Sequence, residues 1–385
     1  MRKNEPVNDP QTSTPALADL YKRHSSKWRR FPGDVIPMHV AEMDFEIAQP
    51  VRELISRMAL ESDLGYLGPV PEVGEAFVDF ASARWNWSVD ASQLKLATDV
   101  GVATVEYLRA HLKPGERVVI NSPVYSGFFE WLKELDIEPF DVPLTKTADG
   151  WRLDLSALEQ AFTAGHLTLL LCNPHNPVGR AFDREELTAL AALAAKYGAT
   201  VLSDEIHAPL TYGEFVPYLT CGADAEATGI VITSASKSWN LAGLKAAFLV
   251  AQGEAMAKKV GALPAALHWR TSILGAFAMA EAYRSGVQWL DTTLATLNHN
   301  RQYLKREIDR LLPDVGYEIP EAGYLAWLDL SATNLTTERI LNEAKVSLVA
   351  GPDMGGRAYE NFARLNFATS EQIITEGLER IAAIN

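Results

Sequence analysis

The sequence predicts an α/β fold with a mostly parallel sheet between helices in a large domain, plus a smaller α+β domain. Three observations predict it. Between residues 99 and 250, short apolar runs alternate with longer helical periods, which is typical of βαβ units. The apolar runs are continuous, as expected for strands covered on both faces. After residue 289, a long polar helical stretch leads into a new pattern that mixes strands and helices.

Composition limits the possible classes of protein. The chain has 385 residues, of which 48% are hydrophobic and 22% charged, so it can bury a large core in two domains. The net charge of -14 and the lack of a basic stripe argue against a nucleic-acid partner. No apolar run predicts a membrane span or a signal peptide. Cys172 and Cys221 are too few for a disulfide scaffold, and we expect a cytoplasmic protein.

The order of elements can be predicted along the chain. The first fifteen residues are polar and are expected to form a loose arm, after which structure begins near Leu17. The clearest unit is "TLLLCNPHNPVGRAFDREELTALAALAAKYGATVLSDE". It predicts a strand over 168–172, a helix between the N-cap Asp183 and the terminating Gly198, and a strand from Thr200. The runs "RVVINSP" and "GIVITSAS" predict two further strands.

These elements suggest a division into domains. We expect residues 1–44 to form the arm and part of the small domain. Residues 45–288 would form the large domain, and residues 289–385 would complete the small one.

Polar residues follow three of the predicted strands. Asn173 to Asn176 follow "LLLC", Ser203 to His207 follow "TVL", and Ser234 to Lys237 follow "IVIT". In a parallel sheet, ligands bind outside the carboxyl ends of the strands, so neighbouring strands would bring these groups together. Each motif alone also fits a turn, a solvated loop or a packing histidine. Their joint occurrence favours a functional site.

An amine, a carboxylate and an anion site together indicate pyridoxal 5′-phosphate (PLP) chemistry. Lys237 would form a Schiff base with the aldehyde, and Asp204 would keep the ring nitrogen protonated. Asn176 and His207 would donate hydrogen bonds to the ring oxygen. A predicted helix start in "TDVGVATVEYL" offers backbone N–H groups to the phosphate. These donors would be Gly101, Val102 and Ala103.

Further side chains complete the predicted cofactor site. Ser234 and Lys245 would bind the phosphate through a hydroxyl and an ammonium group. Ser236, next to Lys237 in "SASK", is also expected to bind the cofactor. Tyr125 in "SPVYSGF" would stack on the ring, although an aromatic residue there also fits a core position.

The ordered set HNPVG, SDEIH and SASK, with a cation eight residues after the lysine, resembles fold-type I PLP enzymes, the aspartate aminotransferase superfamily, across essentially the whole chain. The resemblance is closer to the MalY/PatB-type carbon–sulfur β-lyases (cystathionine β-lyases). The motifs that carry it are "IPMHVAEMDF", "LGY", "PVYSGFF", "NPHNPVGR", "SDEIHAPL", "SASKSWNLAGLK" and "ARLNFA".

The resemblance implies further roles. Arg364 would receive the substrate carboxylate, a bidentate task suited to guanidinium, although a buried ion pair is the alternative. Tyr66 would reach the cofactor phosphate of a neighbouring subunit, which implies a homodimer with shared sites. Ala41 would contact the substrate. Near it, His39 and Glu42 stand where the family commonly has Trp and Asp.

A second departure lies in "SDEIHAPL", where Ala208 and Pro209 replace a small residue and Asp. Both departures concern the substrate side chain more than the cofactor. The reaction implied is β-elimination from L-cystathionine or a related cysteine S-conjugate, giving pyruvate, ammonia and a thiol, as in methionine biosynthesis.

Other functions are possible for parts of this pattern. A PLP-dependent class I/II aminotransferase of small amino acids would use the same residues. A regulatory protein on this scaffold would be expected to carry an added basic domain or to lack the lysine. No HExxH or GxSxG motif supports a metal hydrolase or a serine hydrolase, and no metal is expected.

Overall fold

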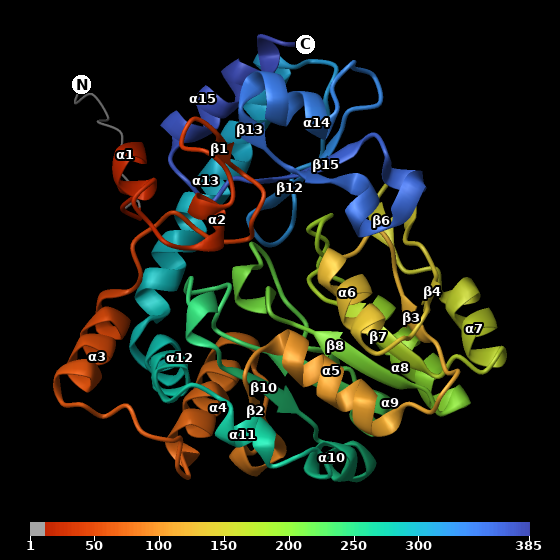
Figure 1. The fold of residues 1–385 in the computed structure, drawn as a ribbon. Coiled ribbons are helices and arrows are strands. Elements are labelled where there is room, and N and C mark those ends of the chain that lie inside the picture. The colour runs from red at the N-terminus through yellow and green to blue at the C-terminus, as the bar shows by residue number, and fades with distance from the viewer. Residues whose placement is uncertain (1–11) are drawn as a thin grey trace, which may run out of the picture.

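The structure, a computed structural model, describes residues 12–385 (Figure 1). Most of the predicted arm therefore lies outside the described residues. Thr12, the first described residue, donates its backbone N–H to Oγ1 of Thr296 at 3.0 Å. No helix within the described part of the chain is long and apolar enough to cross a membrane.

A seven-stranded sheet organises the large domain, in the order β2-β10-β9-β8-β7-β3-β4. Only β10 runs in the direction opposite to the other six strands, which confirms the mostly parallel sheet. The strands are β2 (Leu94–Ala97), β3 (Val118–Ile120), β4 (Pro139–Asp141), β7 (Thr168–Cys172), β8 (Thr200–Asp204), β9 (Gly229–Thr233) and β10 (Ala247–Val250).

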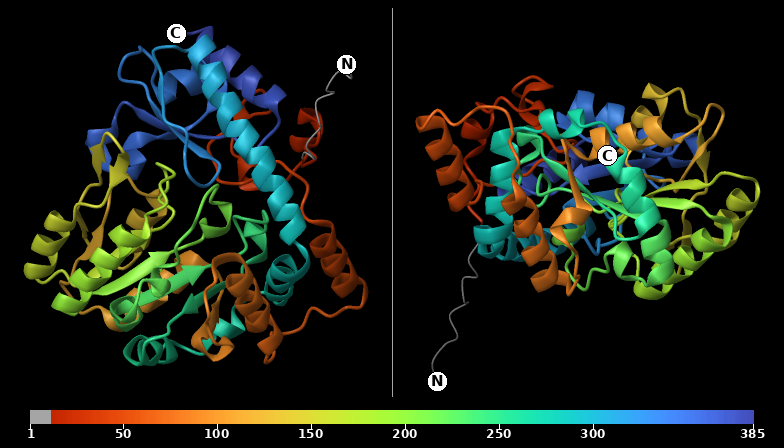
Figure 2. Two further views of the ribbon diagram at one scale, coloured as in Figure 1. Left: turned by 180° about the vertical axis from the view of Figure 1, so that it is seen from behind. Right: turned by 90° about the horizontal axis from the view of Figure 1, so that it is seen from below.

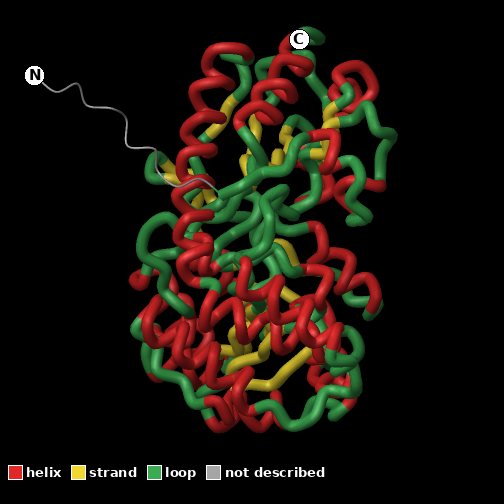
Figure 3. Tube along the Cα trace, turned by 90° about the vertical axis from the view of Figure 1, so that its left-hand side faces the viewer, coloured by secondary structure: helices red, strands yellow, loops and turns green. Residues whose placement is uncertain are grey.

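Helices cover both faces of this sheet, and alternate side chains of each strand face opposite layers (Figure 3). Leu170 and Leu202 pack in the layer that contains α5 (Val100–His111), whereas Leu169 and Val201 pack in the other. The first layer also contains α6 (Ser126–Glu134) and α10 (Glu254–Gly261). The second contains α4 (Pro71–Trp85), α7 (Leu155–Thr163), α8 (Arg184–Tyr197) and α12 (Ile273–Ser285).

The predicted unit around the HNPVG motif has the expected boundaries. Asp183 caps α8 by accepting from the Glu186 N–H at 2.9 Å, and the left-handed Gly198 ends the helix. This arrangement follows the sequence because the cap and the terminating glycine act locally.

The small domain combines a four-stranded sheet with helices, as predicted. Its sheet has the order β11-β12-β15-β14, formed by β11 (Gly316–Tyr317), β12 (Leu325–Asp329), β15 (Phe362–Asn366) and β14 (Val349–Ala350). Its helices are α14 (Thr337–Arg339) and α15 (Glu371–Ala382). The long helix α13 (Val287–Leu311) runs from the large domain into the small one (Figure 2). A boundary at residue 288 therefore falls in the first turn of α13.

The N-terminal segment packs on the small domain. Strand β1 (Ile36–Pro37) pairs in parallel with β13 (Val346–Ser347), so residues far apart in sequence lie side by side. The described part of the predicted 1–44 unit thus contacts the small domain through β1, and residues 1–11 lie outside the described residues. The remaining α-helices and strands are α1 (Leu17–Leu20), α2 (Ser26–Arg29), α3 (Gln49–Leu60), β5 (Thr145–Thr147), β6 (Gly150–Arg152), α9 (Ala223–Thr228) and α11 (Ala266–Trp269).

Candidate active site

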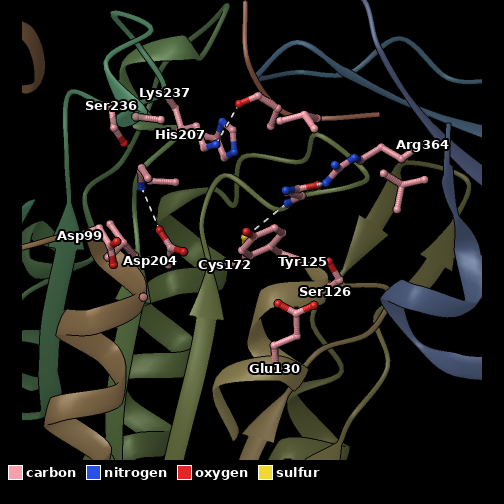
Figure 4. A pocket seen from close by; sticks show the side chains of 18 of the residues that line it. Asp99, Tyr125, Ser126, Glu130, Cys172, Asp204, His207, Ser236, Lys237 and Arg364 are labelled. Carbon is pink, nitrogen blue, oxygen red and sulfur yellow. Dashed lines mark hydrogen bonds between the residues drawn. The ribbon is translucent and has the colours of Figure 1, made fainter. Parts of the chain in front are cut away.

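A cavity of about 650 Å³ lies at the carboxyl ends of β7, β8 and β9, where residues of both domains meet. The three strands are adjacent in the sheet, so the polar groups that follow them converge as expected. Figure 4 shows Lys237, Asp204, Tyr125 and Arg364 around this cavity, carried by different elements. The predicted residues that line it are Ala41, Gly101, Tyr125, Asn176, Asp204, His207, Ser236, Lys237, Lys245 and Arg364. Those that do not are Tyr66, Val102, Ala103 and Ser234.

Lys237 follows β9 and extends its amine into the cavity. Its Nζ donates to the backbone oxygen of Ala41 at 2.9 Å. Burial is the largest cause, and the positive charge of Arg364 the second, of the lowering of the pKa of Lys237 to about 8. With this pKa about a tenth of the amine is unprotonated at pH 7, far more than for an exposed lysine, and the unprotonated form is the one that acts as a nucleophile or base.

Asp204 is the last residue of β8 and is buried beneath the cavity. Its Oδ1 accepts from the backbone N–H of Ile206 at 3.1 Å. Burial raises the pKa of Asp204 to about 7, partly offset by that hydrogen bond and by the charge of Lys237. A cationic ring nitrogen placed beside this carboxyl would favour its ionised form.

His207 lies three residues beyond Asp204 and is also buried. Burial, together with the charges of Lys237 and Arg364, lowers the pKa of His207 to about 3. The imidazole is therefore neutral. Its Nδ1 is buried and has no hydrogen-bond partner within residues 12–385, so it can bind a polar group of a ligand.

Arg364 lies on β15 and enters the cavity from the small domain. It donates to Asn176 Oδ1 at 3.1 Å and to the backbone oxygen of His39 at 2.9 Å, while its Nε has no partner. No ion pair of the described residues includes Arg364, so the alternative of a buried pair with a core carboxylate is not found. Burial lowers the pKa of this guanidinium to about 10. A buried cation without an anion indicates that an anionic ligand completes the site.

Tyr125 precedes α6 and packs closely against the first turn of that helix. A Cβ added at Gly127 would lie 2.3 Å from the Tyr125 ring, so only glycine permits this ring position. The ring also meets Trp131 edge-on, at a centroid distance of 5.8 Å. Tyr125 is thus held as one wall of the cavity.

The start of α5 differs in detail from the expectation. Val102 donates its N–H to Asp99 Oδ1 at 2.7 Å, and Ala103 donates to the Asp99 backbone oxygen at 2.9 Å. Within the described chain, no acceptor is found for the N–H groups of Val100 and Gly101, the first two residues of the helix. These two groups, rather than those of Val102 and Ala103, are available to an anion.

The predicted hydroxyl and ammonium groups near α5 also have partners. Ser234 Oγ donates to the Ala246 oxygen at 2.6 Å and accepts from the Ser236 N–H at 3.0 Å. Lys245 Nζ lies 2.9 Å from Asp99 Oδ2. Ser234 thus shapes the loop before Lys237 rather than lining the cavity.

Sequence reasoning missed several residues near the lysine. Tyr324 is fully buried and donates its hydroxyl to the Ala41 oxygen at 3.1 Å, the same oxygen that accepts from Lys237. Asn240 bonds both the N–H and the oxygen of Met43, at 2.9 Å each. Only the folded chain brings these residues together, so no local signal identifies them.

The fold and a cavity that gathers a buried amine, a buried carboxyl and a buried guanidinium fit an enzyme whose ligand carries negative charge. The chain belongs to the family "Aminotransferase class I and II", whose pattern matches residues 34–381. It is 34% identical over 374 residues to the "Cystathionine beta-lyase" of Corynebacterium glutamicum, covering 96% of this chain and 99% of that one. It is 37% identical over 395 residues to a "Putative cystathionine beta-lyase" of Mycobacterium tuberculosis, covering 94% of each chain.

A solved structure from Corynebacterium diphtheriae is similar over the whole length. It is described as a "putative plp-dependent beta-cystathionase", superposes with a TM-score of 0.91 and is 31% identical, covering 97% of this chain and 98% of that one. The predicted fold-type I architecture is therefore confirmed.

The residues present fit PLP. Lys237 can bind its aldehyde carbon and Asp204 can pair its ring nitrogen, while the neutral His207 side chain lines the same cavity. The cavity volume lies in the usual range for cofactor pockets. Arg364, whose Nε has no partner among the described residues, can bind a further anionic group.

Proposed function

We propose that this protein is a PLP-dependent carbon–sulfur β-lyase that acts on L-cystathionine or a related cysteine S-conjugate. The observation that carries the proposal is the convergence of buried Lys237, Asp204 and Arg364 on one cavity. The choice of a lyase over an aminotransferase is supported by the relatives that share about a third of the sequence. In the reaction, the thioether and water give pyruvate, ammonia and a thiol.

Each residue performs a defined task. Arg364 binds the substrate carboxylate and fixes the α-carbon near Lys237. The freed Lys237 amine, oriented by the Ala41 oxygen, removes the α-proton. When bound, PLP supplies the electron sink that accepts the electron pair left at that carbon. Asp204 holds the proton on the ring nitrogen of the cofactor. His207 is neutral, so it contacts the cofactor without adding a charge to the site.

β-Elimination is favoured for a thioether because a thiolate is a good leaving group. Its departure requires only alignment with the ring. Transamination requires Lys237 to deliver a proton to the cofactor carbon and a keto acid to enter the same pocket.

The test uses purified protein loaded with PLP. Incubation with L-cystathionine should release pyruvate, ammonia and free thiol in equal amounts, whereas L-alanine with 2-oxoglutarate should give little glutamate. Glutamate at comparable rates without thiol release would make the protein an aminotransferase. Borohydride reduction should place the pyridoxyl label on Lys237, and a label on Lys245 would contradict the assignment.

We also propose a homodimer with shared active sites. Tyr66 does not line the cavity of its own chain, and its side chain is 89% exposed. Leu60, Leu64 and Trp269 are also exposed apolar residues, as expected for a surface that a second copy covers. In this arrangement Tyr66 binds the cofactor phosphate of the neighbouring subunit.

Subunit mixing tests this arrangement. Inactive Tyr66→Phe and Lys237→Ala proteins should recover activity after exchange, since one of the two sites in each hybrid dimer is intact. Exchange without recovery would show that Tyr66 does not act across the dimer. The proposed activity fits an enzyme of methionine biosynthesis. The two free thiols, Cys172 and Cys221, fit a cytoplasmic location.

A further inference from the structure

Asp99 lies at the end of the cavity where the cofactor phosphate is expected. It caps α5 with one carboxylate oxygen, which accepts from Val102 N–H at 2.7 Å. The other oxygen lies 2.9 Å from Lys245 Nζ. Asp99 and Lys245 both line the cavity, and Figure 4 shows Asp99 among the lining side chains. An acidic side chain therefore occupies the part of the site that should attract an anion.

The positive groups available to a phosphate are few. The structure leaves the N–H groups of Val100 and Gly101, while the Val102 N–H is used by Asp99. A Cβ at Gly101 would lie 2.8 Å from the Trp131 indole, so this part of the helix is fixed by packing. Lys245 is the lining cation nearest α5, and its one ion pair among residues 12–385 is with Asp99.

The carboxylate is not required for capping. Asn caps helices about as well as Asp because both side chains offer an oxygen to the free N–H groups. The charge of Asp99 thus has a separate effect. It neutralises Lys245 and repels a phosphate dianion bound at the same helix end. The pair is partly exposed, with 53% of Lys245 and 34% of Asp99 accessible, so a phosphate can compete for the ammonium.

We propose that Asp99 weakens the hold of this site on the cofactor phosphate, so that retention of the cofactor depends on its covalent bond to Lys237. The proposal rests on the proposed function. Its consequence is selectivity between cofactor forms. The aldehyde form is retained through Lys237, whereas pyridoxamine 5′-phosphate, which cannot form that bond, is released. This selectivity benefits a lyase. Accidental transamination converts the bound cofactor to its amine form, which cannot support the reaction, and weak phosphate binding lets that form leave.

The experiment compares wild-type, Asp99→Asn and Asp154→Asn proteins, prepared as full-length chains freed of cofactor. Asp154 is a matched control because it caps α7 at Ala157 N–H, 2.9 Å away, and does not line the cavity. Titration calorimetry measures the Kd of pyridoxamine 5′-phosphate and of inorganic phosphate, neither of which bonds covalently to lysine. Asp99→Asn should bind both about tenfold more tightly, and Asp154→Asn should match wild type.

Salt provides a second comparison. The difference between Asp99→Asn and wild type should shrink at about 1 M NaCl, where exposed charges are screened. If Asp99→Asn does not fold, Asp99→Ser retains a capping oxygen without charge and replaces it in every measurement.

Weaker binding by the uncharged variants would overturn the proposal, because it would mean that Asp99 holds Lys245 in position for the phosphate. Unchanged affinity would also overturn it. The proposed function fails separately, if PLP does not label Lys237 or if no thiol is released from cystathionine.

Discussion

Replacing Arg364 by lysine tests how the site recognises its substrate. The guanidinium is buried, donates to Asn176 and to the His39 oxygen, and has no anionic partner among the described residues. Lysine keeps the positive charge but replaces a planar fork of donors by a single ammonium group. The substitution therefore removes bidentate recognition while it preserves the charge.

The size of the effect follows from the hydrogen bonds lost. A carboxylate bound to the fork receives two charge-assisted hydrogen bonds, and an ammonium group at the end of a shorter side chain supplies one at most. A hydrogen bond to a charged group contributes about 1.5–3 kcal/mol. At 1.4 kcal/mol per factor of ten, kcat/KM should fall about 10- to 150-fold.

Steady-state thiol release from L-cystathionine measures this effect, and the cofactor absorbance shows that PLP remains bound. Arg152→Lys is the matched control, because Arg152 pairs with Asp183 and Glu186 outside the cavity. It should leave kcat/KM unchanged. If Arg364→Lys retained full kcat/KM, or lost PLP while substrate affinity stayed the same, the assignment of Arg364 to the substrate carboxylate would be wrong.

Three further outcomes are expected. The rate at which PLP attaches to the cofactor-free protein should rise with pH up to about 8, the pKa of Lys237, and level off above it; stopped-flow absorbance would show a flat profile if this were wrong. Arg364→Met should move that midpoint upward, since the Arg364 charge is the second cause of the lowered pKa after burial; an unmoved midpoint would mean that burial alone sets it. Burial raises the pKa of Glu205 from 4.5 to about 8, so its contribution to stability is complete below about pH 4.5 and is lost as the pH rises through 8. Glu205→Gln should therefore reduce the fall in Tm of the cofactor-free protein between pH 6 and 9, and parallel Tm curves for the two proteins would contradict this reasoning.

The order of elements in the large domain was predictable because its signals are local. The N-cap Asp183 and the left-handed Gly198 bound α8, and both act within one turn of the helix. The strand over 168–172 is recognisable from its continuous apolar run. The rule that ligands bind at the carboxyl ends of parallel strands then placed Lys237 and Asp204 together.

The free N–H groups at the start of α5 were predicted less well. The motif around Gly101 located the helix start, but the assignment of donors depends on where Asp99 directs its side chain. One carboxylate oxygen of Asp99 accepts from the nearby Val102 N–H, whereas the other pairs with Lys245, which is distant in sequence. A capping rule applied to Asp99 would have identified the engaged Val102 N–H, whereas the ion pair required the fold.

The sequence by itself determined the class of fold, the lysine and the carboxylate, because strand patterns, caps and ordered motifs are encoded over short distances. Only the tertiary structure decided how the 39–44 segment meets the site. There the Ala41 oxygen accepts from both Lys237 and Tyr324, and the His39 oxygen accepts from Arg364. These contacts join residues about 200 to 325 positions apart. Every residue has a backbone oxygen, so the residue type does not show which of these oxygens will accept a side-chain hydrogen bond. Only the folded arrangement of the two domains shows it.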